Sequence, residues 1–151
     1  YLLISDLGLL NTRIALIIVY TVFAFPLAIA ILTAFMRSIP RELEESAMID
    51  GAGLVRIFTS ITLPLSMPAI ATAAILKFLT AWNEFIFAMM LTSGNRLRTL
   101  PVGLASFRGE HQTDYASLFV GMVITMIPTL LVYVLLSERI MRGVASGAVK
   151  G

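Results

Sequence analysis

The side chains most able to do chemistry in this sequence lie in one short, otherwise apolar stretch. Lys77, Thr80 and Glu84 fall at positions i, i+3 and i+7, so in a helix they share one face, with Asn83 beside them. An ionised group that faces lipid costs about 2.5–3.5 kcal/mol on insertion scales, so the two charged residues need partners in protein or water. The stripe either faces a polar pathway or is satisfied inside a helix bundle. The ring of Trp82 could likewise stack on a bound molecule or pack against other helices.

Other kinds of chemistry have little basis in the sequence. The chain has no cysteine, which excludes disulfides and thiolate chemistry, and its single His111 has no second histidine with which to share a metal. No Gly-x-Ser-x-Gly, His-Glu-x-x-His or P-loop pattern occurs, so we expect no catalytic residue, no metal, no cofactor and no ATP hydrolysis by this chain. The net charge of +2 comes without a basic cluster, which argues against binding of nucleic acid.

The composition indicates that lipid surrounds these residues. Hydrophobic residues make up 58% of the chain and charged residues 13%, with a mean hydropathy of +0.92. Soluble domains average about 45–50% apolar and about 25% charged residues, so a soluble chain of this size could not cover its surface. We therefore predict an all-α membrane protein, a polytopic bundle of transmembrane helices with three spans in this chain.

Three apolar segments are long enough to cross a membrane. Residues 14–36 and residues 115–137 each contain 23 residues without a charge. A helix of that length measures about 34 Å, against a hydrocarbon core of about 30 Å. Residues 65–92 form the remaining span, which two charged residues interrupt. This span is either one tilted helix or a helix broken near Trp82.

The distribution of basic residues gives an orientation. Three spans place the segment 38–63 and the tail 138–151 on one side of the membrane, and the loop 93–114 on the other. The first side carries six basic residues: Arg37, Arg41, Arg56, Arg139, Arg142 and Lys150. The second carries four: Arg13, Arg96, Arg98 and Arg108. The positive-inside rule therefore predicts that the segment 38–63 and the C-terminus are cytoplasmic.

Residues 38–63 are more regular than a connector needs to be. Pro40 suits the first turn of a helix, acidic residues follow it, and Gly51 suits a left-handed cap after Asp50. A second helix carries an apolar ridge made of Leu54, Ile57, Phe58, Ile61 and Leu65. Most helix–helix connections have about 2–8 residues, so a helix–turn–helix here indicates a specific role. The ridge packs either on the bundle itself and the lipid headgroups, or on a partner.

The spacing within this segment resembles the EAA loop of bacterial ATP-binding-cassette (ABC) importer permeases. The matching pattern is Glu45-Ser46-Ala47, three residues, Gly51, nine residues, then Ile61-Thr62-Leu63-Pro64, with Ser46 where the family has Ala. The resemblance implies a coupling helix in a cleft of a cytoplasmic ATPase, with Glu45 paired to a basic group there and Gly51 permitting close backbone approach. The predicted coupling site comprises Glu45, Ser46, Ala47, Asp50, Gly51, Ile61, Leu63 and Pro64.

Two further stretches resemble the carbohydrate importers within that family. Ala81-Trp82-Asn83-Glu84-Phe85 is similar to a sequence typical of their permeases, and residues 146–151 are similar to the C-terminus of the smaller permease in maltose-type importers. The candidate translocation path then comprises Lys77, Thr80, Trp82, Asn83 and Glu84. By the same resemblance Gly147, Lys150 and Gly151 contact the ATPase, unless the tail is only a frayed terminus. The chain opens without Met or a signal pattern, so we expect the C-terminal portion of a longer subunit.

The resemblance also implies partners and a location. The partners are a dimer of cytoplasmic ATP-binding subunits, a second permease subunit, an extracytoplasmic substrate-binding protein that meets the loop 93–114, and membrane lipid. The location is the plasma (inner) membrane of a bacterium or archaeon, and the chain is a transport subunit, not an enzyme. The solute stays open between a sugar and a related compound such as glycerol 3-phosphate. The alternatives are a secondary transporter driven by an ion gradient, with Glu84 as its ion site, and a membrane-embedded enzyme.

Overall fold

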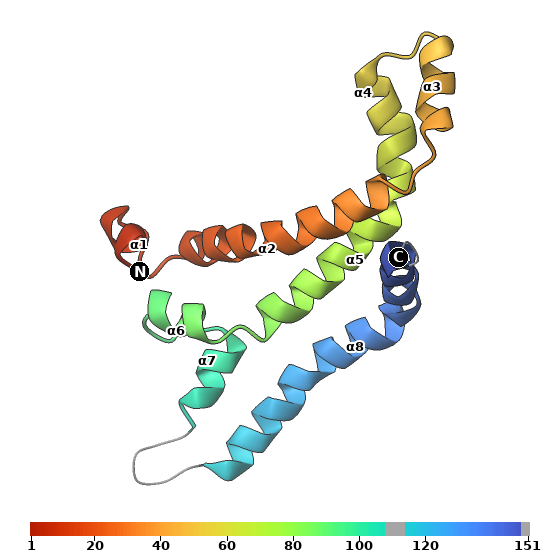
Figure 1. Ribbon diagram of the computed structural model, residues 1–151. Helices are drawn as coiled ribbons and strands as arrows, with labels where there is room; N and C mark the ends of the chain where they lie inside the picture. The colour runs from red at the N-terminus through yellow and green to blue at the C-terminus, as the bar shows by residue number, and fades with distance from the viewer. Residues whose placement is uncertain (108–113, 149–151) are drawn as a thin grey trace. The chain divides into compact units, whose positions relative to one another are not determined.

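The computed structural model describes residues 1–107 and 114–148, and within that range it contains helices and no strand (Figure 1). The helices are α1 (Leu2–Asp6), α2 (Arg13–Met36), α3 (Arg41–Ile49), α4 (Leu54–Ile57), the π-helix η1 (Phe58–Thr62), α5 (Leu63–Trp82), α6 (Ile86–Leu91), α7 (Leu100–Ala105) and α8 (Tyr115–Ala148). The predicted all-helical membrane fold is confirmed.

Three helical stretches are long and apolar enough to cross a membrane: Arg13–Met36, Leu54–Trp82 and Tyr115–Leu135. Such helices suit lipid because each backbone amide and carbonyl finds its partner inside the same segment. The helix α2 covers the predicted span 14–36, and α8 covers the predicted span 115–137. The predicted span 65–92 is divided, because α5 ends at Trp82 and α6 begins at Ile86. Of the two forms considered from the sequence, the structure has the broken helix.

The chain divides into two compact units, one of residues 1–24 and 78–134 and the other of residues 25–77 and those from 135 onward. The first unit has a small apolar core that α1, the start of α2 and α6 share. Ile4, Ala15 and Leu91 are buried in it, and Leu16, Val19 and Phe87 are among the side chains that pack against them. These contacts place α6 against the first half of α2.

One loop residue of the first unit ties the start of α2 to the end of α6. Asn11 has a φ of 57°, its amide donates to the carbonyl oxygen of Leu91 at 2.9 Å, and its side-chain oxygen accepts from the amide of Ser93 at 2.9 Å. Asparagine tolerates this left-handed conformation better than most residues. Next to it, the hydroxyl of Thr12 accepts a hydrogen bond from the amide of Ala15 at 3.2 Å and so caps α2.

The second unit contains the predicted helix–turn–helix, with α3 and α4 side by side (Figure 1). From α4 the chain passes through η1 into α5 without leaving the helix. Pro64 explains the π-helix: it has no amide hydrogen for the carbonyl of Ser60, and in a regular α-helix its ring would press on that carbonyl. A wider turn before the proline relieves the clash. The helix therefore continues through Pro64, between the predicted segment 38–63 and the predicted span 65–92.

Only part of the predicted ridge packs inside the hairpin. Ile57 is buried and Ile61 is half-buried, whereas Leu54 and Phe58 are exposed by 78% and 48%. A π turn holds more residues than an α turn, so the regular helical spacing assumed for the ridge does not extend through η1. One part of the ridge packs inside the hairpin, and the other part remains open on its surface.

Candidate functional sites

The turn between α3 and α4 has the hydrogen bonds of a Schellman motif. Gly51 has a φ of 80°, its amide donates to the carbonyl oxygen of Met48 at 3.0 Å, and the amide of Ala52 donates to that of Ala47 at 2.9 Å. Glycine adopts this left-handed geometry at no steric cost. The turn itself therefore requires the glycine of the predicted coupling site. A Cβ on Gly51 would meet no described atom of the chain within 4 Å, so the outer side of the turn is open.

The other residues of the predicted coupling site divide between the surface of the hairpin and its inner side. Exposed are Glu45, Ser46, Asp50 and Pro64; half-buried are Ala47, Ile61 and Leu63. The hydroxyl of Ser46 donates to the carbonyl oxygen of Leu43 at 3.0 Å. Its polar group is thus satisfied within α3, which is why serine can stand at a position where the family pattern has alanine.

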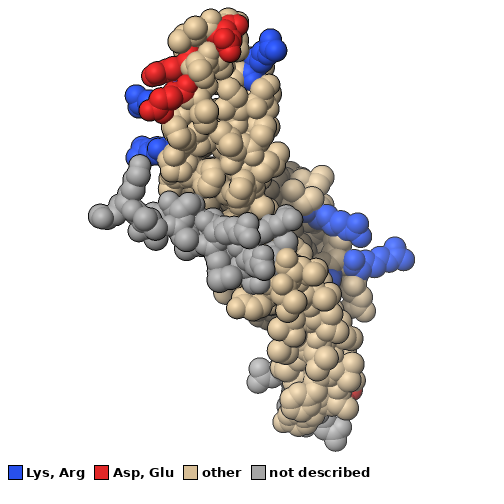
Figure 2. Space-filling view, turned by 90° about the vertical axis from the view of Figure 1, so that its right-hand side faces the viewer, with Lys and Arg blue, Asp and Glu red and all other residues tan. Residues whose placement is uncertain are grey.

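Four large apolar side chains surround the turn and form what we name the apolar tip: Met48, Ile49, Leu54 and Val55, exposed by 51%, 87%, 78% and 78%. Acidic and basic side chains lie close together over α3 and α4 (Figure 2). An exposed apolar group with a polar rim marks an interaction surface more often than chance. Of these four residues, only Leu54 was predicted from the sequence to belong to an apolar surface. The sequence signal for the other three was that two adjacent apolar residues stand on each side of the glycine turn.

The hairpin also has a hollow of about 210 Å³ on one side of the turn. Its walls include the apolar side chains of Ile57 and Ile61 together with the charged groups of Asp50 and Arg56. At the inner side of the hairpin, the hydroxyl of Thr62 donates to Oε1 of Glu44 at 3.2 Å, which joins α3 to η1. The hairpin is therefore an ordered element that has an exposed apolar tip and, beside it, a small hollow.

The helix break after Trp82 is stabilised by the two polar residues that follow it. The side-chain amide of Asn83 donates to the carbonyl oxygen of Leu79 at 2.8 Å, which satisfies one of the last carbonyls of α5. The carboxylate of Glu84 accepts hydrogen bonds from the amides of Phe87 and Ala88 at 2.8 and 3.0 Å, which satisfies two of the first amides of α6. Asn83 ends one helix and Glu84 begins the next.

The remaining residues of the candidate path lie on α5. Trp82 stacks on Phe78 with ring centroids 5.8 Å apart, and its indole nitrogen donates to the carbonyl oxygen of Thr125 on α8 at 3.1 Å. Its ring therefore packs on a side chain of its own helix, and its polar atom bonds to α8. Lys77 is half-buried and Thr80 is exposed. Sequence reasoning missed Tyr20, whose hydroxyl donates to Oε2 of Glu84 at 2.8 Å.

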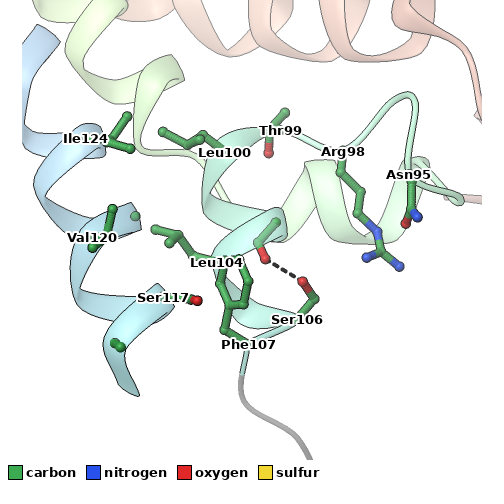
Figure 3. A pocket seen from close by; sticks show the side chains of 13 residues that line it. Asn95, Arg98, Thr99, Leu100, Leu104, Ser106, Phe107, Ser117, Val120 and Ile124 are labelled. Carbon is green, nitrogen blue, oxygen red and sulfur yellow. Dashed lines mark hydrogen bonds between the residues drawn. The ribbon is translucent and has the colours of Figure 1, made fainter. Parts of the chain in front are cut away.

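A groove of about 830 Å³ runs between α7 and α8 in the first unit (Figure 3). Apolar side chains from both helices face each other across it: Leu100 and Leu104 from α7, Val120 and Ile124 from α8. The helices approach closely at Gly121, where a Cβ would collide with the side chain of Leu104. Arg98 and Asn95 lie beside each other at one edge, so the groove has an apolar floor and a polar margin (Figure 3).

Asp114 stabilises the start of α8. Its carboxylate accepts hydrogen bonds from the hydroxyl of Ser117 at 2.6 Å and from the amide of Ser117 at 3.1 Å. These bonds, led by the one from the hydroxyl, lower the pKa of Asp114. Asp114 therefore acts as the N-terminal cap of α8.

Some predicted residues lie outside the described part of the chain. His111 and the basic Arg108 of the loop 93–114 fall there, as do Lys150 and Gly151 of the predicted ATPase-contacting tail, while Gly147 belongs to α8. Among the residues that the structure describes, no three His, Asp or Glu side chains come together in a way that could hold a metal ion.

The sequence pattern of the family described as "Binding-protein-dependent transport system inner membrane component" matches residues 1–146. The chain belongs to this family. The resemblance to ABC importer permeases is thereby confirmed. The hairpin and the helix break described above therefore belong to a protein of this family. Membership also makes the chain part of a multi-pass membrane protein, in agreement with its three apolar helices.

Three relatives in this permease family match nearly the whole chain. The trehalose/maltose transport system permease protein of Thermococcus litoralis is 41% identical over 149 residues, which are 98% of this chain and 54% of the relative. The trehalose transport system permease protein of Mycobacterium tuberculosis is 41% identical over 147 residues, 96% of this chain and 54% of the relative. The sulfoquinovosyl glycerol transport system permease protein of Agrobacterium fabrum is 39% identical over 145 residues, 96% and 51%. The chain thus spans about half the length of these relatives.

Proposed function

We propose that this chain is part of the permease of an ATP-driven sugar importer and that its hairpin, residues 38–63, couples the permease to a separate ATP-binding subunit. The observation that carries the proposal is the apolar tip held out by the Schellman turn at Gly51. A helix–turn–helix that exposes Ile49 and Leu54 by 87% and 78% has an apolar surface that the described residues of its own unit leave uncovered. A cleft on a partner protein would remove that surface from water.

The charges of the hairpin support a protein partner. Glu45 and Asp50 are exposed beside the apolar tip, and Arg56 lines the hollow next to it. We propose that Glu45 pairs with a basic group of the ATP-binding subunit, while the apolar tip fills the cleft. A rigid hairpin held in a cleft that moves during ATP hydrolysis would pass that motion to the helix α5, which continues from it.

The orientation and the other partners follow from this role. The hairpin and the C-terminal tail would lie in the cytoplasm, where a dimer of ATP-binding subunits would carry out the hydrolysis. A second permease subunit would complete the pathway through the membrane. The loop 93–114 would face an extracytoplasmic substrate-binding protein, and the apolar groove between α7 and α8 supports a contact there.

We propose a sugar or glycoside as the solute. The relatives' names refer to trehalose, maltose and sulfoquinovosyl glycerol, which share a hydroxyl-rich ring. The path is proposed to run past the face that carries Lys77, Thr80 and Glu84, with Trp82 and Asn83 beside it. The contacts of Trp82, Asn83 and Glu84 with protein groups favour a role for these three residues in shaping the wall of the path.

The tail is proposed to contact the ATP-binding subunits through Gly147, Lys150 and Gly151. Deletion of residues 146–151 from the intact subunit tests this role. We expect a lower rate of ATP hydrolysis by the assembled importer, and unchanged transport and hydrolysis would show that the tail is only a frayed end.

The proposed function is tested by purifying the intact permease from its native membrane and reconstituting it in proteoliposomes. We expect an ATP-binding subunit and a second permease to co-purify, and uptake of a sugar to require ATP and to ignore proton uncouplers. Uptake that runs without ATP and stops with an uncoupler would instead identify a secondary transporter.

A further inference from the structure

The carboxylate of Glu84 is held by donors from two helices. Its Oε2 accepts the hydroxyl hydrogen of Tyr20 on α2 at 2.8 Å and the amide hydrogen of Ala88 on α6 at 3.0 Å. Its Oε1 accepts the amide hydrogen of Phe87 at 2.8 Å. A carboxylate away from bulk water needs such donors, and hydrogen bonds to an ionised acceptor are stronger than those between neutral groups. The three hydrogen bonds stabilise the ionised carboxylate through protein groups alone, without a solute.

Other contacts hold α6 in the same place. The rings of Phe23 on α2 and Phe87 on α6 lie with their centroids 5.0 Å apart. At the far end of α6, the amide of Asn11 donates to the carbonyl oxygen of Leu91. Ala88, in the middle of α6, has an exposed fraction of 0%. The short helix is therefore fixed to α2 at its beginning and along its side, and to the loop before α2 at its end.

We propose that Tyr20 is a positioning residue: its hydroxyl holds the Glu84 carboxylate over the first amides of α6 and thereby fixes the broken span to α2. A helix of six residues is too short to be stable by itself in water, so its place depends on such contacts. Tyr20 lies one turn from Phe23 on α2, and the two side chains together meet both Glu84 and Phe87. The break after Trp82 is thus a fixed part of the permease wall, and Glu84 serves as a fixed charge within it.

This inference deepens the proposed transport role and rests on it only where uptake is measured. These 151 residues contain no cysteine, so once any cysteines elsewhere in the importer are replaced by serine, a single engineered thiol reports on one position. In the intact importer, Ala88→Cys places a thiol at the buried side of α6, and Ser93→Cys places one in the exposed loop that follows. The rate at which a small maleimide modifies each thiol measures how often that position opens.

We expect Tyr20→Phe to raise the rate of modification of Ala88→Cys about tenfold, because a hydrogen bond to a charged group is strong enough to change a local opening equilibrium by that factor. Glu84→Gln should have a similar effect, and the variant with both changes should be no faster than the faster single variant, since the two groups act as one unit. The modification of Ser93→Cys should stay the same throughout. Tyr133→Phe, at an exposed tyrosine of α8, is the matched control and should leave both rates unchanged.

A rate for Ala88→Cys that changes less than twofold in Tyr20→Phe overturns the proposal, as does a double variant whose rate equals the product of the two single effects. If Ala88→Cys does not assemble, the same comparison is made on the uptake rate of the chain without thiols. Equal losses of uptake rate in Tyr20→Phe, Glu84→Gln and the double variant show that the two residues act together. A double variant whose loss is the product of the two single losses contradicts the proposal. The thiol measurement needs no solute and no ATP, so its failure is distinct from a failure of the proposed function.

Discussion

Thr62 and Glu44 join the two arms of the hairpin: the hydroxyl of Thr62 donates to Oε1 of Glu44 at 3.2 Å across a sequence separation of 18 residues. Glu44 lies in α3, and Thr62 is the last residue of η1, directly before α5. The bond thus connects the helix that carries Glu45 to the start of a membrane span. In the proposed mechanism, this connection makes the hairpin and the beginning of α5 move as one body.

Thr62→Val keeps the shape of the side chain and removes the hydroxyl. We expect α3 to open more easily, because the hydrogen bond to η1 is lost. The free energy of opening should fall by only about 0.5–1.5 kcal/mol, since water can replace the hydroxyl at the half-exposed carboxylate of Glu44. Hydrogen exchange of the α3 amides measures this opening. The control is Thr59→Val, whose hydroxyl donates within its own helical segment to the carbonyl oxygen of Val55 at 2.9 Å. Equal exchange in the two variants would show that the bond between the arms contributes nothing.

Variants of Gly51 separate its role in the backbone of the turn from a contact with a partner protein. Gly51→Ala should reduce ATP-dependent uptake, because an L-residue in the left-handed region costs about 1–2 kcal/mol. Gly51→Asn tolerates this region better and should retain more uptake, unless a partner backbone also approaches the turn closely. Gly51→Asp should abolish uptake. Gly53→Ala is the control, since a Cβ there meets no described atom within 4 Å and φ is −72°.

The exposed carboxylate of Glu45 is proposed to pair with a basic group on the ATP-binding subunit. Glu45→Lys should abolish ATP-coupled uptake, since it replaces an attraction in the cleft by a repulsion, while the protein remains in the membrane. Glu42→Lys makes the same change one turn earlier on α3 and should retain most of the uptake. Normal uptake by Glu45→Lys, measured in the same membranes, would remove the residue from the coupling surface.

Substitution of Trp82 tests whether its ring packs against protein or contacts the solute. Trp82→Phe keeps an aromatic ring next to Phe78 and removes the donor to the carbonyl oxygen of Thr125. Hydrogen bonds between membrane helices contribute about 0.6 kcal/mol on average, so we expect a small loss of thermal stability in detergent and the same preference among sugars. A changed preference among solutes at unchanged stability would place the ring against the solute.

Local patterns in the sequence predicted much of the fold. Runs of uncharged residues gave the spans, and the Asp50-Gly51 pair gave the turn, because a left-handed cap depends on neighbouring residues only. The π-helix was missed, although Pro64 inside a continuous helix was an available signal for a distorted turn. Of the apolar tip only Leu54 was predicted, because the apolar side chains that stay exposed beside the turn depend on how α3 and α4 pack together.

The contact between Tyr20 and Glu84 could not be predicted in the same way. The two residues are separated by 64 positions, and their meeting depends on which faces of α2 and α6 pack together. The sequence offered Glu84 as a charge in need of a partner and named solute, water and protein as candidates. Only the packed structure supplies the hydroxyl of Tyr20 and the amides of α6 as those donors.

Docking of the hairpin in a cleft of an ATP-binding subunit is tested most directly at Ile49, which is 87% exposed in this chain. Ile49→Cys introduces a single thiol at the apolar tip, and Ser38→Cys places one at the base of the hairpin, where the residue is also exposed. The rate of maleimide modification is measured in inside-out vesicles with and without the ATP-binding subunit. We expect the subunit to slow the modification of Ile49→Cys at least tenfold and that of Ser38→Cys far less. Equal rates for Ile49→Cys in the presence and absence of the subunit would contradict the account.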